Sequence, residues 1–194
     1  MDTDGGGWTV IQRRTGPKES FNRIWNDYKI GFGDKYADHW LGNDDIHMLA
    51  TIKPNTLRVE LKDCNDYNSF EFYKQFWIQN ETDQYRLHLS RGEGLAGDGL
   101  HYSDVEPLDQ NGMQFSTADR DNDQNAGRNC AGQWKTGWWF NDCGASNLNG
   151  VYKLDCEYYT SPTDGIVWFP WKYRMQYSAK KTEMKIRPIG FKPL

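Results

Sequence analysis

This 194-residue sequence has no long apolar run and no excess of basic charge, and its aliphatic residues are sparse. A membrane-spanning helix needs about 18 or more consecutive apolar residues, and no such run occurs, so we expect no membrane insertion. The formal net charge is -4. Because binding to phosphate backbones depends on clustered Lys and Arg, nucleic acid is not expected to be a partner.

Recognisable catalytic motifs are also missing. The chain has no HExxH sequence of a zinc protease, and no serine or cysteine nucleophile stands in a known motif. Its four histidines are scattered over segments that we interpret as faces of strands or helices: His39, His47, His88 and His101. We therefore expect a protein that is not an enzyme.

The start of the sequence lacks the basic and apolar regions of a signal peptide. The chain is therefore expected to be either cytosolic or a piece of a longer secreted protein. Two features favour secretion. The four cysteines form an even set without the CxxC spacing of zinc or redox motifs. In addition, Asn80-Glu81-Thr82 is a sequon that predicts N-glycosylation of Asn80.

Aromatic residues and glycine are plentiful, with 9 Trp, 11 Tyr and 19 Gly, which favours short strands, ordered loops and an aromatic core. Helical spacing predicts short helices over 21–30, capped by Ser20, and over 43–50. The segment 102–177 shows almost no regular pattern, so we expect other bonds to hold it in place. Alternating apolar and polar residues predict antiparallel strands over 8–14, 56–63, 69–79, 85–90 and 183–188.

The densest group of side-chain oxygens lies at alternate positions of one loop, at Asp119, Asp121, Asp123 and Asn125. Alternate oxygens in an irregular loop can converge on one point, and such hard donors suit Ca²⁺. Asp and Asn also favour turns with no ion present, so a surface turn remains the alternative. An EF-hand is excluded, because the twelfth residue from Asp119 is Cys130 where Glu is needed.

Short motifs along the whole chain resemble those of the fibrinogen C-terminal domain, also called the fibrinogen-like domain. They are DGGGWTV at 4–10, GFGD at 31–34, WLGN at 40–43, LRVEL at 57–61, NGMQFST at 111–117, DND at 121–123, GWW at 137–139, SNLNG at 146–150 and EMKIRP at 183–188. The resemblance implies an α+β fold, with a central twisted antiparallel sheet, short helices and a loop-rich calcium-binding subdomain.

The same resemblance implies boundaries within a single domain, and most of the family's N-terminal subdomain is expected to be missing. The expected parts are a residual N-terminal part at 1–45, the central sheet at 46–104, the loop-rich calcium and ligand subdomain at 105–180, and a returning strand and tail at 181–194.

For the metal, the resemblance implies Ca²⁺ bound by the carboxylates of Asp121 and Asp123 and by following backbone carbonyls, which we place at Asn125 and Gly127. Asp119 then becomes an acceptor outside the ligand set. The resemblance also implies a disulfide that closes the neighbouring loop, between Cys130 and Cys143.

The remaining two cysteines depart from the family pattern. We expect a bridge between Cys64 and Cys156, because a secreted protein seldom keeps two free thiols. Such a bridge would tie the sheet to the loop-rich part. Two separate buried thiols remain the alternative.

Lectin-like members of this family bind acetylated groups in a pocket beside the calcium, and a cis peptide, here Asp142–Cys143, aims amides into it. Trp134 stands where these members have a pocket aromatic, although a core position is the alternative. Gly144 stands at their histidine position, so the pocket is only partly kept. The implied ligand-binding residues are Gln133, Trp134, Asp142, Cys143, Gly144, Pro162 and Thr163.

The resemblance implies a calcium-dependent extracellular recognition module that binds glycans or acetylated groups in innate immunity. Glycine at the position of Gly144 also occurs in receptor-binding members such as the angiopoietins. Binding to a cell-surface receptor protein is therefore the alternative. Upstream coiled coils or collagen stalks cluster these domains in relatives, so we expect oligomers formed through segments absent from this chain.

Overall fold

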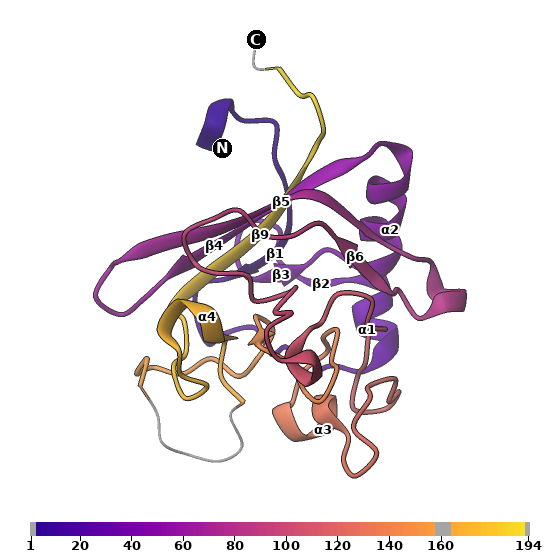
Figure 1. Cartoon of the computed structure of the whole chain (residues 1–194), viewed down its shortest axis with the longest axis vertical. Helices are drawn as coiled ribbons and strands as arrows, with labels where there is room; N and C mark the ends of the chain where they lie inside the picture. The colour runs from indigo at the N-terminus through magenta and orange to yellow at the C-terminus, as the bar shows by residue number, and fades with distance from the viewer. Residues whose placement is uncertain (1–2, 158–163, 193–194) are drawn as a thin grey trace.

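The computed structural model describes residues 3–157 and 164–192. A seven-stranded sheet crosses the molecule in the order β2-β3-β1-β9-β4-β5-β6, and its neighbouring strands are antiparallel (Figure 1). The strands are β1 (Thr9–Arg14), β2 (Phe32–Gly33), β3 (His39–Trp40), β4 (Asn55–Lys62), β5 (Asn68–Ile78), β6 (Leu87–Leu89) and β9 (Lys181–Pro188), with a separate antiparallel pair of β7 (Ser146–Asn147) and β8 (Val167–Trp168).

Helices are short throughout the described residues. They are α1 (Trp25–Ile30), α2 (Asn43–Ile52), α3 (Cys130–Trp134) and α4 (Phe169–Lys172), with 3-10 turns at Thr3–Gly5, Glu81–Asp83 and Glu106–Leu108. None of them is long and apolar enough to cross a membrane. A large antiparallel sheet with few, short helices confirms the expected α+β class.

The last strand of the chain lies at the centre of the sheet. β9 pairs with β1 on one side and with β4 on the other. Thr182, Met184 and Ile186 are buried on one face, as expected for alternate residues of a strand, and Lys185 between them is buried as well. The expectation of a returning strand near the C-terminus is confirmed.

The prediction for the first helix was wrong at its start. The helix α1 begins at Trp25, and its N-cap residue is Ile24, whose side chain makes no capping hydrogen bond and is half exposed. Instead, Asp119 accepts a hydrogen bond from the N–H of Trp25 at 2.9 Å. A cap supplied from 94 residues away leaves no local sequence signal, whereas Ser20 looked like a local cap.

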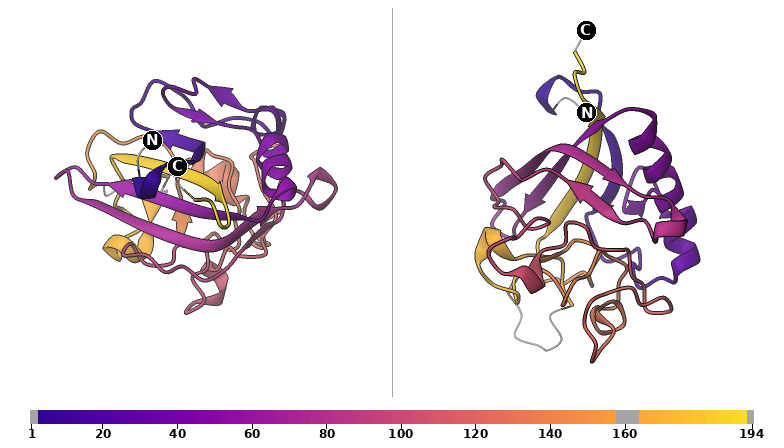
Figure 2. Two further views of the ribbon diagram at one scale, coloured as in Figure 1. Left: turned by 90° about the horizontal axis from the view of Figure 1, so that it is seen from above. Right: turned by 45° about the vertical axis from the view of Figure 1, so that its right-hand side comes forward.

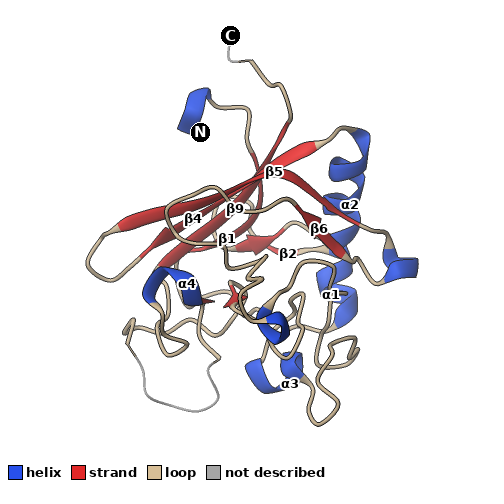
Figure 3. Ribbon diagram, in the orientation of Figure 1, coloured by secondary structure: helices blue, strands red, loops and turns tan. Residues whose placement is uncertain are grey.

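Below the sheet, the chain from about 100 to 180 forms a layer of loops that contains α3, α4 and the β7–β8 pair (Figures 1 and 3). The first described residues and the segment after β9 lie together at the end of the molecule away from these loops (Figure 2). Aromatic side chains fill the space between sheet and loops, including Tyr28, Trp40, Phe115 and Trp139. The expected aromatic core is therefore present.

A disulfide between Cys64 and Cys156 connects the two parts, which confirms the second bridge and excludes the alternative of free thiols. Cys64 follows β4 in the sheet, while Cys156 belongs to the loop layer. Next to the bridge, the ammonium group of Lys172 in α4 lies 2.7 Å from a carboxylate oxygen of Asp63. A covalent bond and an ion pair thus hold the loop layer against the same end of the sheet.

Candidate functional site

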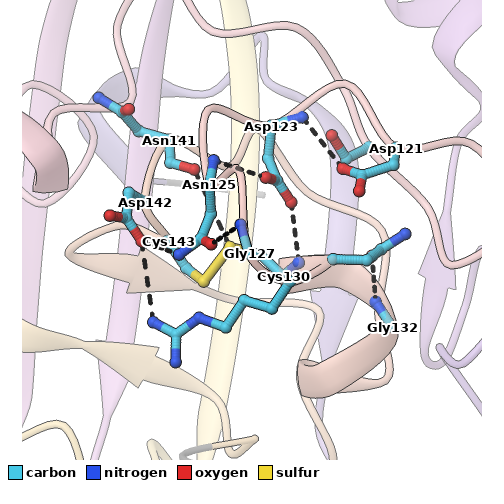
Figure 4. The surroundings of a disulfide bond; sticks show 12 residues. Asp121, Asp123, Asn125, Gly127, Cys130, Gly132, Asn141, Asp142 and Cys143 are labelled. Atoms are coloured by element: carbon cyan, nitrogen blue, oxygen red, sulfur yellow. Dashed lines mark hydrogen bonds and ion pairs between the residues drawn. A yellow bond between two sulfur atoms is a disulfide. The ribbon is translucent and has the colours of Figure 1, made fainter.

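The expected metal loop is built from three successive Asx turns (Figure 4). Asp121 accepts a hydrogen bond from the N–H of Asp123 at 3.3 Å, and Asp123 accepts one from the N–H of Asn125 at 2.9 Å. Asn125 in turn accepts one from the N–H of Gly127 at 2.9 Å. The alternation in the sequence is thus explained first by turn geometry, since each side chain bonds the amide two residues further on.

Asp123 is the best anchored carboxylate of this loop. Its second oxygen accepts a hydrogen bond from the N–H of Cys130, the first residue of α3, at 2.8 Å. Partial burial raises the pKa of Asp123 to about 6; the two amide hydrogen bonds oppose this rise, and the neighbouring carboxylate of Asp121 adds to it. Two carboxylates therefore stand close together with little positive charge to balance them.

These two carboxylates fit a hard divalent cation such as Ca²⁺ in residue type. The neighbouring Cys130 is in a disulfide and offers no thiolate for a softer metal. Among the described residues, no three Asp, Glu, His or Cys side chains form a metal-binding group. A cation here would therefore depend on Asp121, Asp123, backbone carbonyls and water.

The side chain of Asn125 is not expected to bind a cation, because both of its polar atoms already form hydrogen bonds. Its amide nitrogen donates a hydrogen bond to the carboxylate of Asp142, and its oxygen already accepts from Gly127 (Figure 4). The Asn125 side chain is thus engaged within the protein, and the assignment of its backbone carbonyl to a metal stays a prediction. Asp119 is likewise engaged elsewhere, because it accepts hydrogen bonds from Trp25 and from the hydroxyl of Thr117.

The disulfide between Cys130 and Cys143 lies directly beside this loop, as the resemblance implied. The peptide bond between Asp142 and Cys143 is cis, which confirms that expectation. The preceding residue, Asn141, holds the segment in place: its side chain donates to the carbonyl of Asp109 at 2.8 Å, and its N–H donates to the carbonyl of Cys143 at 2.7 Å. The sequence reasoning did not single out Asn141, since a lone Asn carries no pattern.

Not all of the predicted ligand-binding residues lie together at the surface. Trp134 is 6% exposed and packs edge-to-face on Phe140, so this structure places it in the core. Gln133 is partly exposed, and its side-chain oxygen has no hydrogen-bond partner within the described part of the chain. Pro162 and Thr163 lie outside the described residues. The assignment of these residues to ligand binding stays a prediction.

Gly144 shows why the histidine of acetyl-binding relatives would not fit here. A Cβ atom at this position would lie 2.3 Å from the side-chain nitrogen of Gln110. Gln110 is fully buried and fixed, because it donates to the carbonyl of Ser146 and accepts from the N–H and hydroxyl of the same residue. Gln110 is thus a site-shaping residue that sequence reasoning missed.

The sequon residue Asn80 is exposed on the surface. Its side-chain oxygen accepts hydrogen bonds from the N–H and hydroxyl of Thr82 at the start of the 3-10 turn Glu81–Asp83. Exposure in a turn is what an enzyme that attaches glycans requires. Glycosylation itself stays a prediction.

The sequence profile described as "Fibrinogen beta and gamma chains, C-terminal globular domain" matches residues 1–189. The chain is 44% identical to human (Homo sapiens) fibrinogen-like protein 1 over 199 residues, with 98% of this chain and 62% of that protein covered. It is also 44% identical to techylectin-5A of Tachypleus tridentatus over 196 residues, with 98% of this chain and 63% of that protein covered. The chain thus spans a little under two thirds of the length of these curated relatives.

Solved structures of similar proteins share the fold. The fibrinogen-like globe domain of human ANGPTL2 superposes with a TM-score of 0.89 at 40% identity, covering 95% of this chain and 82% of that one. Lamprey fibrin D-dimer, complexed with the peptide Gly-His-Arg-Pro-amide, gives a TM-score of 0.91 at 36% identity, covering 97% and 63%. The sequence profile, the relatives and the fold agree, and the chain belongs to the fibrinogen C-terminal domain family.

Proposed function

We propose that this chain is a non-catalytic, calcium-dependent recognition module of an extracellular protein. One observation carries the proposal: Asp123 bonds both the metal loop, at Asn125, and the first residue of the disulfide-closed loop, Cys130. A cation on Asp121 and Asp123 would therefore stiffen the loop from Cys130 to Cys143. It would hold a neighbouring binding surface in shape and take no part in a reaction.

The residues proposed to hold Ca²⁺ are the carboxylates of Asp121 and Asp123 and the carbonyls of Asn125 and Gly127. When bound, the cation would supply positive charge where two carboxylates stand together. Secretion is supported by the two disulfides, because bridges of this kind rarely persist in the cytosol. Recognition in innate immunity is proposed from the likeness to techylectin-5A, whose name marks it as a lectin.

The ligand of the leading proposal is a glycan or an acetylated group, bound at the surface formed by Gln133, Asp142, Cys143 and their neighbours. The test is calorimetry and a glycan array with acetylated and sialylated sugars, in calcium and in EDTA. Asp123→Asn should lose both calcium and sugar binding. Asp45→Asn removes one exposed carboxylate from α2 and should bind normally. Absence of sugar binding by the folded, calcium-loaded wild type would exclude the glycan proposal.

The second candidate is a module that binds a cell-surface receptor protein. It is favoured by Gly144 and Gln110, which close the position of the histidine in acetyl-binding relatives, and by the likeness to the ANGPTL2 globe domain. Binding of the labelled chain to cells should then survive enzymatic removal of cell-surface glycans. Asp142→Arg, at an exposed position beside the cis peptide, should weaken that binding. Loss of all cell binding after glycan removal would favour the lectin instead.

A further inference from the structure

A small cavity of about 170 Å³ lies between the end of β1 and the loop layer. Neither carboxylate of the proposed calcium site lines it, and no cysteine does. Its lining includes Arg14, Ser20, Asn22, Lys135, Gly150 and Tyr152. Pockets for drug-sized ligands measure roughly 300–1,000 Å³. This cavity is therefore smaller than a pocket for a drug-sized ligand. It can hold a single functional group and the few atoms attached to it.

Arg14 is an unusual residue for such a cavity, because its charge is buried without an ionic partner. It is 1% exposed, and Nη1 donates to the carbonyl of Gly150 at 2.6 Å. Its guanidinium carbon lies 4.0 Å from the centre of the Phe21 ring. Within the described residues, Nε has no hydrogen-bond partner. Burial lowers the pKa of Arg14 to about 10, which agrees with a cation that the protein compensates poorly.

The carboxylates nearest to this cation are already engaged. Glu19 lines the cavity but forms an ion pair with Arg23 at 2.8 Å. Asp38 accepts hydrogen bonds from the N–H and hydroxyl of Thr15, both at 2.6 Å, and from Gly16. No ion pair joins Arg14 to a carboxylate in residues 3–157 and 164–192. Asp38 and Glu19 favour the charged form of Arg14 electrostatically, but neither forms a direct ion pair with it.

A second cation stands at the cavity wall. Lys135 ends α3 in the left-handed conformation, with φ 54°, and its side chain is 56% exposed. Its ammonium lies 3.9 Å from Asp164, whose closer partner is Lys153 at 2.6 Å. Lys135 is thus weakly held and can turn to an incoming anion. Ser20 and Asn22 add a hydroxyl and an amide to the lining.

We propose that this cavity binds a single oxyanionic group, a carboxylate or a sulfate, between Arg14 and Lys135. Arg14 and Lys135 place positive charge at the cavity wall, and charge-assisted hydrogen bonds from such cations to an oxyanion are among the strongest in proteins. The group belongs to an acidic saccharide or is a free inorganic anion. This site is separate from the proposed calcium site, so its occupation does not depend on calcium.

Titrations by NMR and calorimetry with sodium sulfate and with methyl glucuronoside test the proposal, at constant ionic strength maintained with NaCl and in buffer freed of calcium by a chelating resin. Methyl glucoside is the neutral control. We expect saturable sulfate binding by the wild type, with shifted resonances around Arg14 and Tyr152. Binding of the glucuronoside as well assigns the site to acidic saccharides, and binding of sulfate alone assigns it to inorganic anions. Absence of saturable binding by either anion overturns the proposal.

Lys135→Asn is the main variant, because Asn tolerates the left-handed backbone while the charge is lost. It should weaken sulfate binding about fivefold or more. Lys74→Asn removes the same charge from an exposed position on β5, outside the cavity, and should leave binding unchanged. Arg14→Lys keeps a charge but removes the planar guanidinium, and it should weaken binding if circular dichroism shows that it folds. Equal affinities in wild type, Lys135→Asn and Lys74→Asn would overturn the proposal. Because calcium is absent throughout, failure here says nothing against calcium binding at Asp121 and Asp123.

Discussion

The sheet and the loop layer satisfy their backbone groups by different means. In the sheet, strands such as β4, β5 and β9 pair over most of their length. In the loop layer, buried side-chain amides replace the strand partners. Gln110 bonds Ser146, Asn149 donates to the carbonyl of Gly137 at 3.1 Å, and Asn122 donates to Phe115 at 2.7 Å. Both parts nevertheless bury fully enclosed aromatics. Irregular backbone is thus compatible with a packed interior when side chains supply partners for most of its polar groups.

The two parts also differ in what ties them down. The disulfide Cys130–Cys143 spans 13 residues within the loop layer, whereas Cys64–Cys156 spans 92 and joins the layer to the sheet. A cross-link restricts the unfolded chain more when it closes a longer loop. The long bridge should therefore contribute more to global stability, and the short one should mainly hold the local surface.

Removal of the long bridge is the largest expected effect. The chain-entropy relation gives about 4.6 kcal/mol for a loop of the Cys64–Cys156 size and about 3 kcal/mol for that of Cys130–Cys143. Urea unfolding of the Cys64→Ser/Cys156→Ser and Cys130→Ser/Cys143→Ser double variants should show this order. A larger loss of free energy of unfolding for the second variant would mean that the loop layer, rather than its attachment, limits stability.

A matched pair of truncations compares the packing of the two parts. Leu57 in β4 and Leu148 in the loop layer are both fully buried. Replacing a buried Leu by Ala costs about 3 kcal/mol where the surroundings cannot collapse into the cavity. We expect Leu57→Ala and Leu148→Ala to lower the free energy of unfolding by similar amounts of about 3 kcal/mol. A loss below about 1 kcal/mol for Leu148→Ala alone would show that the loop layer relaxes around the cavity.

The ion pair between Asp63 and Lys172 tests the junction through pH. Burial alone would raise the pKa of Asp63, but the hydrogen bonds from Lys172 and from the amides of Tyr67 and Asn65 outweigh it, so the pKa is lowered. A lowered folded-state pKa gives stability that is fully present above the unfolded value near 3.9 and is lost as pH falls through the folded value. Asp63→Asn should therefore cost about 2 kcal/mol at pH 7.

The pH profile separates this electrostatic cause from simple loss of packing. The difference in stability between wild type and Asp63→Asn should shrink below about pH 4, because the wild-type carboxylate then becomes protonated as well. Asp66→Asn, at an exposed position in the same turn, is the control and should have a smaller effect. A difference that stays constant down to about pH 2 would contradict the proposed role of the Asp63 charge.

Sequence reasoning succeeded where local pattern and final structure follow the same rule. Alternation at 56–63 predicted β4 to within a residue or so, because one face of a strand is buried and the other is not. The sheet centre was also predictable, since Met184 and Ile186 alternate with charged residues. The strand expected at 85–90 is shorter, β6 at Leu87–Leu89, because Tyr85 has a left-handed backbone with φ 50°.

In the loop layer, sequence reasoning reached the two disulfides and the cis peptide. Family resemblance implied Cys130–Cys143 and the cis bond, whereas Cys64–Cys156 was expected because a secreted protein seldom keeps free thiols. Nothing periodic marks Gln110, whose role depends on Ser146 across 36 residues, or Asp119, which caps a helix 94 residues earlier. The buried charge of Arg14 was equally hidden, because the strand pattern explained it as an ordinary alternation. Contacts made by single polar side chains over long sequence distances leave no local signal.

Asn125 provides the finest test of how the loop layer works, and the smallest expected effect. Its side chain bonds Gly127 and Asp142, so that only its backbone carbonyl is proposed as a calcium ligand. Asn125→Ala should change calcium affinity by less than about threefold, since threefold corresponds to roughly 0.7 kcal/mol and a single exposed hydrogen bond contributes about that much. Asp123→Asn should instead lower the affinity by about a hundredfold or more, because it removes a charged ligand. Calcium titration by calorimetry on both variants decides the matter: an equal loss for Asn125→Ala would mean that its side-chain oxygen leaves the turn to bind the metal.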